Sequence, residues 1–349
     1  MRFARRLSVA AVALVASARG SAQGTTPPNT ALTLKEMAAM SAAVSPEITL
    51  TAKVENGAFV LTYGPLDLPA HAGHHGGMPE PPPRWITVPV EGWLHGYSVE
   101  IVDEKGAQVP KQTLHHVNVI ATQQRELFSP IMLRVAAAGS ETGDVSLPRL
   151  VGLRTNVGDT LLVRAMLHNP TGRDYKGVRV IVRFPLTKSD AFIGAFRIQP
   201  FYLDVTPPAG SHVYDLPPGH SEHFWESRPA IDARVLGIGG HAHKYAKLLR
   251  FEDRTANSVI WEAKPDTDAT GEIRAIPITR YLARLGYAIK ADHTYRFTAI
   301  YDNPTGATIP DGGMGALGGV VLISNKTPWP HIDPQNADYK LDVWAMWRP

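Results

Sequence analysis

Short runs of alternating apolar and polar residues, separated by Pro and Gly, recur along nearly the whole chain. Residues 48–54, 58–63 and 161–167 alternate with a period of two, as a strand with one buried face does. The 29 Pro and 30 Gly residues favour frequent chain reversals, and Asn56-Gly57 between two such runs predicts a tight hairpin. The pattern predicts an all-β protein with two tandem antiparallel β-sandwich domains of jelly-roll type.

One strand-and-turn unit occurs twice. GDTLLVRAMLHNPTG (158–172) resembles ADHTYRFTAIYDNPTG (291–306), and the two Asn-Pro-Thr-Gly turns lie 134 residues apart, about one sandwich domain. A common turn that recurs by chance is the alternative, but the matching strand before each turn favours a duplication. The residue before the turn is His168 in the first copy and Asp302 in the second.

The chain begins with the pattern of an export signal. Arg2, Arg5 and Arg6 precede a short apolar stretch and then small residues, which predicts a signal peptide and a periplasmic or secreted protein. The expected divisions are a signal peptide over 1–22, a leader with a short helix within 32–43 over 23–47, a first sandwich over 48–190 and a second over 191–349.

Three further segments carry local expectations. Residues 341–347 (LDVWAMW) are apolar except for Asp342 and are expected to form a strand. Thr279 to Leu285 is a helix candidate in the second half. The Gly-rich stretch around Met314 is expected to be a loop.

Charge and cysteine content exclude several classes of function. The predicted signal holds four of the 35 basic residues, so 31 remain against 32 acidic ones, which gives no reason to expect a nucleic-acid or anionic-membrane partner. No segment approaches the roughly 20 apolar residues of a membrane span. The chain has no Cys, so any metal must be held by His, Met, Asp or Glu.

Two histidine groups and one methionine are the candidate metal ligands. His241 and His243 lie two apart in an expected strand, so both side chains would share one face. His115 and His116 are adjacent, so both can reach one ion only at a bulge or strand end, or through different ring nitrogens. In the alternative without a metal, one of these histidines is packed in the core and the other is exposed to solvent.

His168 and Met314 complete the two sets. By its parity, His168 ends a strand on the less uniformly apolar face. Met314 lies among glycines, where it belongs to no apolar stripe, and its thioether favours reduced copper over zinc or calcium. A set of three histidines beside a set of two histidines and one methionine therefore predicts copper that changes oxidation state. His71, His74, His75 and Met78 form a Gly- and Pro-rich cluster that is expected to be a solvated loop or a transient copper-capture segment.

The ordered series resembles the copper type II, ascorbate-dependent monooxygenases, the family of peptidylglycine α-hydroxylating monooxygenase and dopamine β-monooxygenase. The resemblance covers about residues 90–325 and rests on Leu114-His115-His116, Met166-Leu167-His168-Asn169-Pro170, His241-Ala242-His243 and Met314. It implies two β-sandwich domains, each with one copper and with an open solvent gap between them.

The resemblance also implies the role of each ligand set. His115, His116 and His168 would hold an electron-transfer copper, and His241, His243 and Met314 would hold the copper at which O2 is activated. The implied reaction hydroxylates a C–H bond of a small-molecule substrate, with ascorbate or a similar reductant as co-substrate. The substrate-binding Arg and Tyr of the peptide-processing members are replaced here by Gly239 and Gly318, which argues against peptide amidation and leaves the substrate open.

Two other functions are alternatives to the monooxygenase. The first is a non-catalytic exported copper carrier, which the His-rich cluster and the lost substrate clamp favour. The second is a structural pair of sandwiches in which the histidines serve only hydrogen bonding. That interpretation requires six coincidences of residue type and order.

Overall fold

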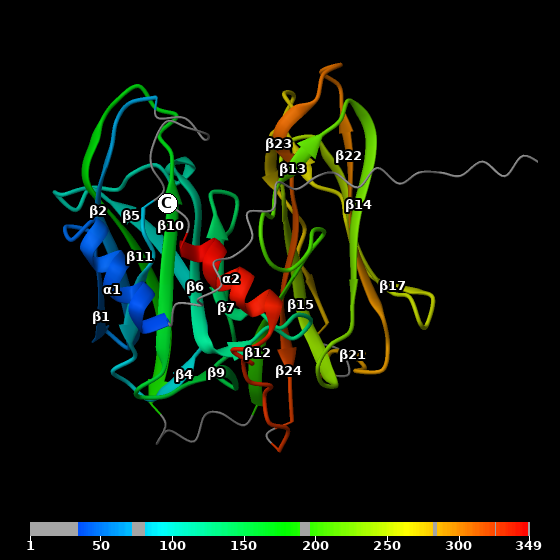
Figure 1. Ribbon diagram of the computed structural model, residues 1–349, viewed down its shortest axis with the longest axis horizontal. Coiled ribbons are helices and arrows are strands. Elements are labelled where there is room, and N and C mark those ends of the chain that lie inside the picture. Colours follow the sequence, from blue (N-terminus) through cyan, green and yellow to red (C-terminus); the bar gives the residue numbers. More distant parts are fainter. Residues whose placement is uncertain (1–33, 72–80, 189–195, 282–284, 325, 348–349) are drawn as a thin grey trace, which may run out of the picture. The chain divides into compact units, whose positions relative to one another are not determined.

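The computed structural model describes residues 34–71, 81–188, 196–281, 285–324 and 326–347 (Figure 1). The predicted signal peptide lies outside these residues, and so does the predicted domain boundary at residue 190. The fold is all-β and of sandwich type, as predicted. No helix among the described residues is long and apolar enough to cross a membrane.

The predicted hairpin at Asn56-Gly57 is present. Strands β1 (Thr49–Glu55) and β2 (Ala58–Leu68) pair antiparallel, with Glu55 opposite Ala58. Asn56 and Gly57 have φ values of 50° and 72°, the left-handed conformation that a two-residue turn of this kind requires.

Two layers of strands form the first half of the molecule. One layer has the order β3-β10-β6-β7, and the other contains β2-β11-β5 with β1 at its edge. Apolar side chains such as Phe59, Val119 and Val163 fill the space between the layers. The bounds are β3 (Arg84–Thr87), β4 (Gly92–Leu94), β5 (Gly96–Val102), the short 3-10 helix η1 (Lys111–Thr113), β6 (Leu114–Arg125), β7 (Met132–Gly139), β8 (Val145–Ser146), β9 (Val151–Thr155), β10 (Thr160–Leu167) and β11 (Tyr175–Lys188).

The second half is built in the same way. One layer has the order β14-β22-β16-β17, and the other contains β12-β24-β15. The bounds are β12 (Phe196–Asp204), β13 (Tyr214–Leu216), β14 (Gly219–Ser227), β15 (Ala233–Ala242), β16 (Ala246–Asp253), β17 (Ser258–Ala263), β18 (Asp266–Thr267), β19 (Ile273–Ala275), β20 (Thr279–Arg280), β21 (Tyr287–Ile289), β22 (Tyr295–Asn303), β23 (Ile309–Gly313) and β24 (Gly315–Leu322).

The two halves repeat one strand order. The layer β3-β10-β6-β7 corresponds to β14-β22-β16-β17, and the trio β2-β11-β5 corresponds to β12-β24-β15, with the strands in the same sequence order. Strands β10 and β22, which precede the two Asn-Pro-Thr-Gly turns, take the same position. The predicted duplication remains an interpretation of this shared order.

The halves are joined by hydrogen bonds and by a shared core. Strand β12 pairs in parallel with β9, so one sheet continues from the first half into the second. Phe128, in the loop between β6 and β7, is only 3% exposed. Its ring centroid lies 5.8 Å from that of Phe201 and 5.9 Å from that of Phe251, both residues of the second half. The first half therefore inserts an aromatic side chain into the core of the second.

The C-terminal segment corrects one expectation. Residues 341–347, expected to be a strand, lie in helix α2 (Ala337–Trp347). Asn336 caps this helix, because its Oδ1 accepts hydrogen bonds from the backbone N–H groups of Asp338 and Tyr339. Asp342 pairs with Arg134 of β7 at 2.7 Å, which fixes the helix against the first half. The apolar residues at positions 339, 343 and 346 share a helical face, as a period near 3.6 predicts.

Of the three other local predictions, the N-terminal helix is confirmed, and the second helix and the Gly-rich loop are not. The predicted N-terminal helix is present as α1 (Leu34–Val44). The helix candidate at 279–285 is wrong at Thr279–Arg280, which is strand β20, and its residues 282–284 lie outside the described residues. The Gly-rich stretch is not a loop but strands β23 and β24, which meet at Met314.

Candidate metal centre

A β-bulge lets His115 and His116 turn to the same side. In the pairing of β10 with β6, Met166 lies opposite His116 and Leu167 opposite Leu114, so His115 is the extra residue. The Nδ1 atoms of His115 and His116 are 2.8 Å apart. This bulge is the condition under which both rings can reach one ion.

His168 comes next to this pair from the end of β10. Its backbone N–H donates to the carbonyl of Thr113, 3.0 Å away, the last residue of η1. Its ring centroid lies 6.2 Å from that of His115, and the residue is 8% exposed. The three predicted ligands of the first set therefore lie together.

His241 and His243 lie at the end of β15, and their ring centroids are 5.6 Å apart. His241 faces away from the core of the second half, because its neighbours Gly240 and Ala242 lie on the core-facing side of the strand. A Cβ at Gly240 would lie 2.6 Å from Leu249. His241 therefore has the orientation that the strand period predicts, whereas His243 follows the end of the strand.

Tyr301 brings His243 and Met314 together. Its hydroxyl accepts hydrogen bonds from the backbone N–H of His243 at 2.9 Å and from that of Met314 at 3.2 Å, and it donates to the carbonyl of Met314. The tyrosine is fully buried on β22, and burial raises its pKa to about 12. One neutral hydroxyl thus fixes the backbone of two predicted ligands from separate strands.

The glycines beside Met314 have a packing role. A Cβ at Gly313 would lie 2.1 Å from the ring of Tyr214, and one at Gly315 would lie 2.7 Å from Ala299. The backbone on both sides of Met314 therefore approaches its neighbours more closely than a larger residue allows. This close approach explains why glycines occupy the strand positions on either side of Met314.

The two ligand sets are adjacent. The ring centroids of His115 and His243 are 6.3 Å apart, so a chain of ring contacts runs from His116 to His241. An open solvent gap between the sets, which the family resemblance implies, is not what the structure shows at these residues.

Glu141, in the turn after β7, crosses from the first half to the second set. Its Oε1 lies 2.7 Å from Nδ1 of His241. Burial acts to raise the pKa of Glu141, but the hydrogen bond and the charge of His241 outweigh it and lower this pKa to about 2. The pKa of His241 is raised: burial opposes this shift, and the bond to Glu141 prevails.

His116 has the opposite electrostatic environment. Burial, together with repulsion from His241 and His212, lowers the pKa of His116 to about 4. A neutral imidazole is the form that binds a metal ion. His116 is therefore ready to act as a ligand at neutral pH.

The donors fit copper in type, and one pair of nitrogens also fits it in distance. Two nitrogens bound at about 2 Å and at right angles on one ion lie about 2.8 Å apart, the separation of the two Nδ1 atoms of His115 and His116. Imidazole and thioether donors suit both oxidation states of copper. Within the described ranges, no group of three His, Asp or Glu side chains is arranged as a complete metal site. The fit rests on donor type and on this one pair.

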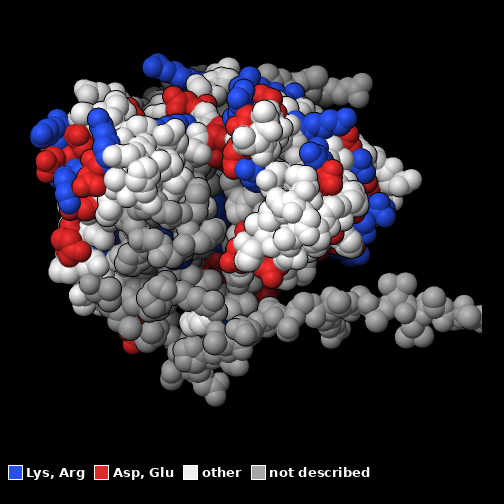
Figure 2. Space-filling model, turned by 90° about the horizontal axis from the view of Figure 1, so that it is seen from above, with Lys and Arg blue, Asp and Glu red and all other residues white. Residues whose placement is uncertain are grey.

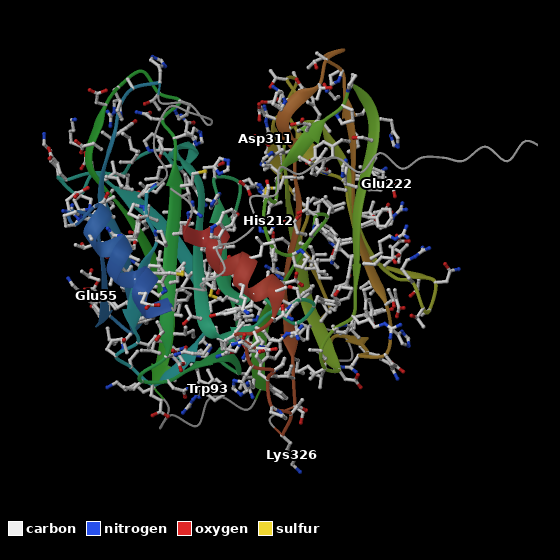
Figure 3. The ribbon with its side chains drawn as sticks, viewed as in Figure 1. Glu55, Trp93, His212, Glu222, Asp311 and Lys326 are labelled. Carbon is white, nitrogen blue, oxygen red and sulfur yellow. The ribbon has the colours of Figure 1, made fainter. Side chains whose placement is uncertain are left out.

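The remaining histidines lie outside the two sets. His74, His75 and Met78 lie outside the described residues, and His71 is exposed. Nδ1 of His212 is 3.2 Å from the buried carboxylate of Asp204, and Figure 3 shows His212 on the side of the second half that faces the first. The ring of His223 stacks on Tyr214 at 3.7 Å.

The sheet surface beside His241 lacks side chains. Gly239 lies directly opposite Gly318 in the pairing of β15 with β24, and His241 lies opposite Ala316. A Cβ at Gly318 would have no atom within 4 Å, whereas one at Gly239 would lie 3.3 Å from Ile278. A cavity of about 510 Å³ lies at the other end of β15, around Ala233, and none of the six predicted ligands lines it.

Sequence reasoning missed Tyr301 and Glu141. Tyr301 stands where the first copy of the repeat has Leu167, and a tyrosine in a buried strand needs a hydrogen-bond partner, so the internal comparison held a signal for it. Glu141 lies in the polar segment ETGD, which is typical of a solvated turn. Only the packing of the two halves shows that it meets His241.

Comparisons with known proteins identify no family. No family model matches the chain, and no curated protein matches it. Among solved structures, PNGF-II is 8% identical with a TM-score of 0.36, and the match covers 79% of this chain and 65% of PNGF-II. A putative secreted protein from Eubacterium rectale is 10% identical with a TM-score of 0.22, covering 69% and 68% of the two chains. The VP2 subviral particle of infectious bursal disease virus is 11% identical with a TM-score of 0.23, covering 81% and 72%. These TM-scores are too low to carry an argument about function.

Proposed function

We propose that this chain is an exported copper-dependent monooxygenase that hydroxylates a C–H bond of a small organic substrate with O2 and a one-electron reductant such as ascorbate. The observation that carries the proposal is the gathering of the six residues named from the sequence. They come from β6, the end of β10, the end of β15 and the junction of β23 with β24. The five histidine rings form one chain of contacts, and the backbone of Met314 shares the Tyr301 hydroxyl with that of His243.

The two sets offer different donors to two copper ions. His115, His116 and His168 would hold one ion, and His241, His243 and Met314 would hold the other. Copper bound there supplies one-electron transfer at the first set and O2 activation at the second. The protein contributes the placement of the donors. The bulge orients two imidazoles, Glu141 orients His241, and Tyr301 fixes the backbone of His243 and Met314.

The surroundings of the second set favour an uncharged substrate. No side chain projects from Gly239 or Gly318 on the sheet face that carries His241, so an arginine–tyrosine clamp for a carboxylate is missing at those two positions. On the face shown in Figure 2, Lys and Arg side chains are interspersed with Asp and Glu over the described surface rather than gathered by sign. Neither feature selects a charged substrate.

Oxygen consumption tests the proposal. The mature chain is loaded with copper, and ascorbate-driven oxygen uptake is measured over a panel of small apolar substrates for the wild type, His243→Ala and Met314→Leu. We expect both variants to lose substrate-coupled uptake while they keep the copper of the first set. His220→Ala, which changes an exposed histidine outside both sets, is the control and should keep full uptake.

Two outcomes would replace the proposal. Two bound coppers without substrate-coupled uptake across the whole panel would favour the exported copper carrier. Copper binding no higher than that of the double variant His116→Ala/His243→Ala would remove both metal functions.

A further inference from the structure

A tight turn after β7 holds Glu141 in place. The backbone N–H of Gly139 donates to Oγ1 of Thr142 at 3.0 Å, and the N–H of Thr142 donates to the carbonyl of Gly139 at 3.2 Å. Lys111 donates to the carbonyl of Thr142 from the 3-10 helix that precedes β6. Gly139 itself lies opposite His116 in the pairing of β7 with β6. The turn that carries Glu141 therefore begins beside the first ligand set.

Gly139 leaves the space that the carboxylate uses. A Cβ at this position would lie 2.5 Å from Oε2 of Glu141 and 2.8 Å from Oε1. The carboxylate is the end of a flexible side chain, so it would swing aside rather than prevent folding. Gly139 thus allows the carboxylate to fold back over the end of β7, and Glu141 is only 14% exposed there.

The hydrogen bond that Glu141 accepts decides which nitrogen of His241 can bind a metal ion. An ionised carboxylate only accepts hydrogen bonds, so Nδ1 of His241, 2.7 Å away, carries a proton. In the neutral ring, Nε2 then holds the lone pair. Carboxylates that bind the far nitrogen of a metal-binding histidine fix its orientation in this way.

We propose that Glu141 is the positioning residue for His241 and ties the second ligand set to the first half of the molecule. It holds the His241 ring so that Nε2 carries the lone pair that can bind a metal ion. It also keeps His241 beside the turn that adjoins His116. The inference rests on the proposed function only for the identity of the metal. The hydrogen bond and its effect on the ring are properties of the metal-free chain.

Nitrogen-15 NMR of the metal-free chain tests the effect on the ring, at a pH at which His241 is neutral. In the wild type we expect the proton on Nδ1 of His241. In Glu141→Ala and in Gly139→Ala, we expect the population to shift towards the form with the proton on Nε2. Glu141→Gln, whose amide oxygen still accepts a hydrogen bond, should restore the wild-type form.

Copper affinity of the second set is the second measurement. It is made in a His168→Ala background, which disables the first set, by competition with a chelator. Glu141→Ala should weaken binding about 10- to 100-fold, as loss of an outer partner of a histidine ligand does. Gly139→Ala should weaken it less, and Glu141→Gln least.

The pair His293 and Asp253 supplies a matched control. Nδ1 of His293 lies 2.7 Å from Oδ2 of Asp253, the same distance as in the Glu141 pair. Asp253→Asn should change the His293 ring and leave both the His241 ring and copper affinity unchanged.

The outcomes distinguish a failure of the positioning role of Glu141 from a failure of the proposed copper function. The same protonated nitrogen of His241 in the wild type and in Glu141→Ala would overturn the positioning role. An affinity unchanged by Glu141→Ala would overturn it as well. If the second set binds no copper at all, the proposed function fails, and the NMR result alone then decides the role of Glu141.

Discussion

The two Asn-Pro-Thr-Gly turns are nearly identical in their bonding. The side-chain amide of Asn169 donates to the carbonyls of Leu68 at 3.1 Å and Arg173 at 2.8 Å, and that of Asn303 donates to Leu216 at 3.2 Å and Ala307 at 2.8 Å. In each turn the asparagine also accepts from the backbone and hydroxyl of the threonine two residues later. Each turn ties the end of one strand, β2 or β13, to the segment just before the strand that follows the turn, β11 or β23.

The ligand sets do not follow this equivalence. His115 and His116 lie on β6, in the layer β3-β10-β6-β7. His241 lies on β15, which corresponds to β5 and belongs to the other layer. Both sets nevertheless lie where the halves meet. The strand order is therefore shared by the two halves, whereas the strands that carry the ligands are not equivalent.

The loops after the corresponding strands β6 and β16 differ in a similar way. The loop after β6 buries Phe128 in the core of the second half, whereas the loop after β16 is exposed around Asn257. The first half has an anchor that the second half lacks at the same place in the fold. Four predictions test this contrast between shared scaffold and specialised contacts.

The largest effect is expected at Phe128. Phe128→Ala removes a buried ring that contacts three aromatic residues of the second half, so the free energy of unfolding should fall by about 3–5 kcal/mol. Val259→Ala, 54% exposed on β17 directly after the corresponding loop, should change it by about 0.5 kcal/mol or less. Urea unfolding measures both. Equal effects of the two substitutions would show that the loops do not differ in this way.

The turns should respond alike. Asn169 and Asn303 are 0% and 1% exposed, and alanine at either position leaves several backbone groups without a partner. Asn169→Ala and Asn303→Ala should each lower the free energy of unfolding by about 2–4 kcal/mol, and the two losses should agree within about 1 kcal/mol. Chemical denaturation of the two variants decides this. A large loss in one variant and almost none in the other would break the equivalence of the turns.

Glu126, at the start of the anchored loop, should make stability depend on pH. Burial, opposed by the charge of Arg134, raises the pKa of Glu126 to about 8. Between its ordinary pKa, about 4.3, and this value the folded state keeps a proton that the unfolded state releases, so raising the pH destabilises the fold. We expect a loss of about 2 kcal/mol or more between pH 5 and pH 9. The control Glu126→Gln should flatten this part of the profile, and an unchanged slope in that variant would contradict the assignment.

The smallest predicted effect concerns Tyr301, whose counterpart in the first half is Leu167. Tyr301→Phe removes the hydroxyl that holds the backbone of His243 and Met314, so copper affinity of the second set should fall about 10-fold, or about 1.4 kcal/mol. The first set should be unaffected. Tyr295→Phe, on the same strand, also removes a hydroxyl that accepts a backbone N–H, that of Lys290, and serves as the control. Equal losses in both variants would indicate a general effect on stability.

The sequence predicted what depends on local periodicity and on residue chemistry. Alternation and turn residues predicted the sandwich strands and the Asn56-Gly57 hairpin, and the histidine spacing predicted residues that the structure brings together. It failed at one local signal, the Asn336 helix cap, and at contacts between residues far apart in the sequence. Residues 341–347 form a helix because Asn336 caps it and Arg134 pairs with Asp342. Glu141 reaches His241 across 100 residues of chain, and no local pattern carries that contact.

Copper stoichiometry tests the central claim most directly. The mature chain, reconstituted with Cu(I) and freed of loosely bound metal, should hold two ions. His168→Ala and His243→Ala should each hold one, and Met314→Leu should lose the sulfur ligand seen in X-ray absorption. Two ions retained in both histidine variants, or an unchanged sulfur signal in Met314→Leu, would contradict the assignment of the two sets.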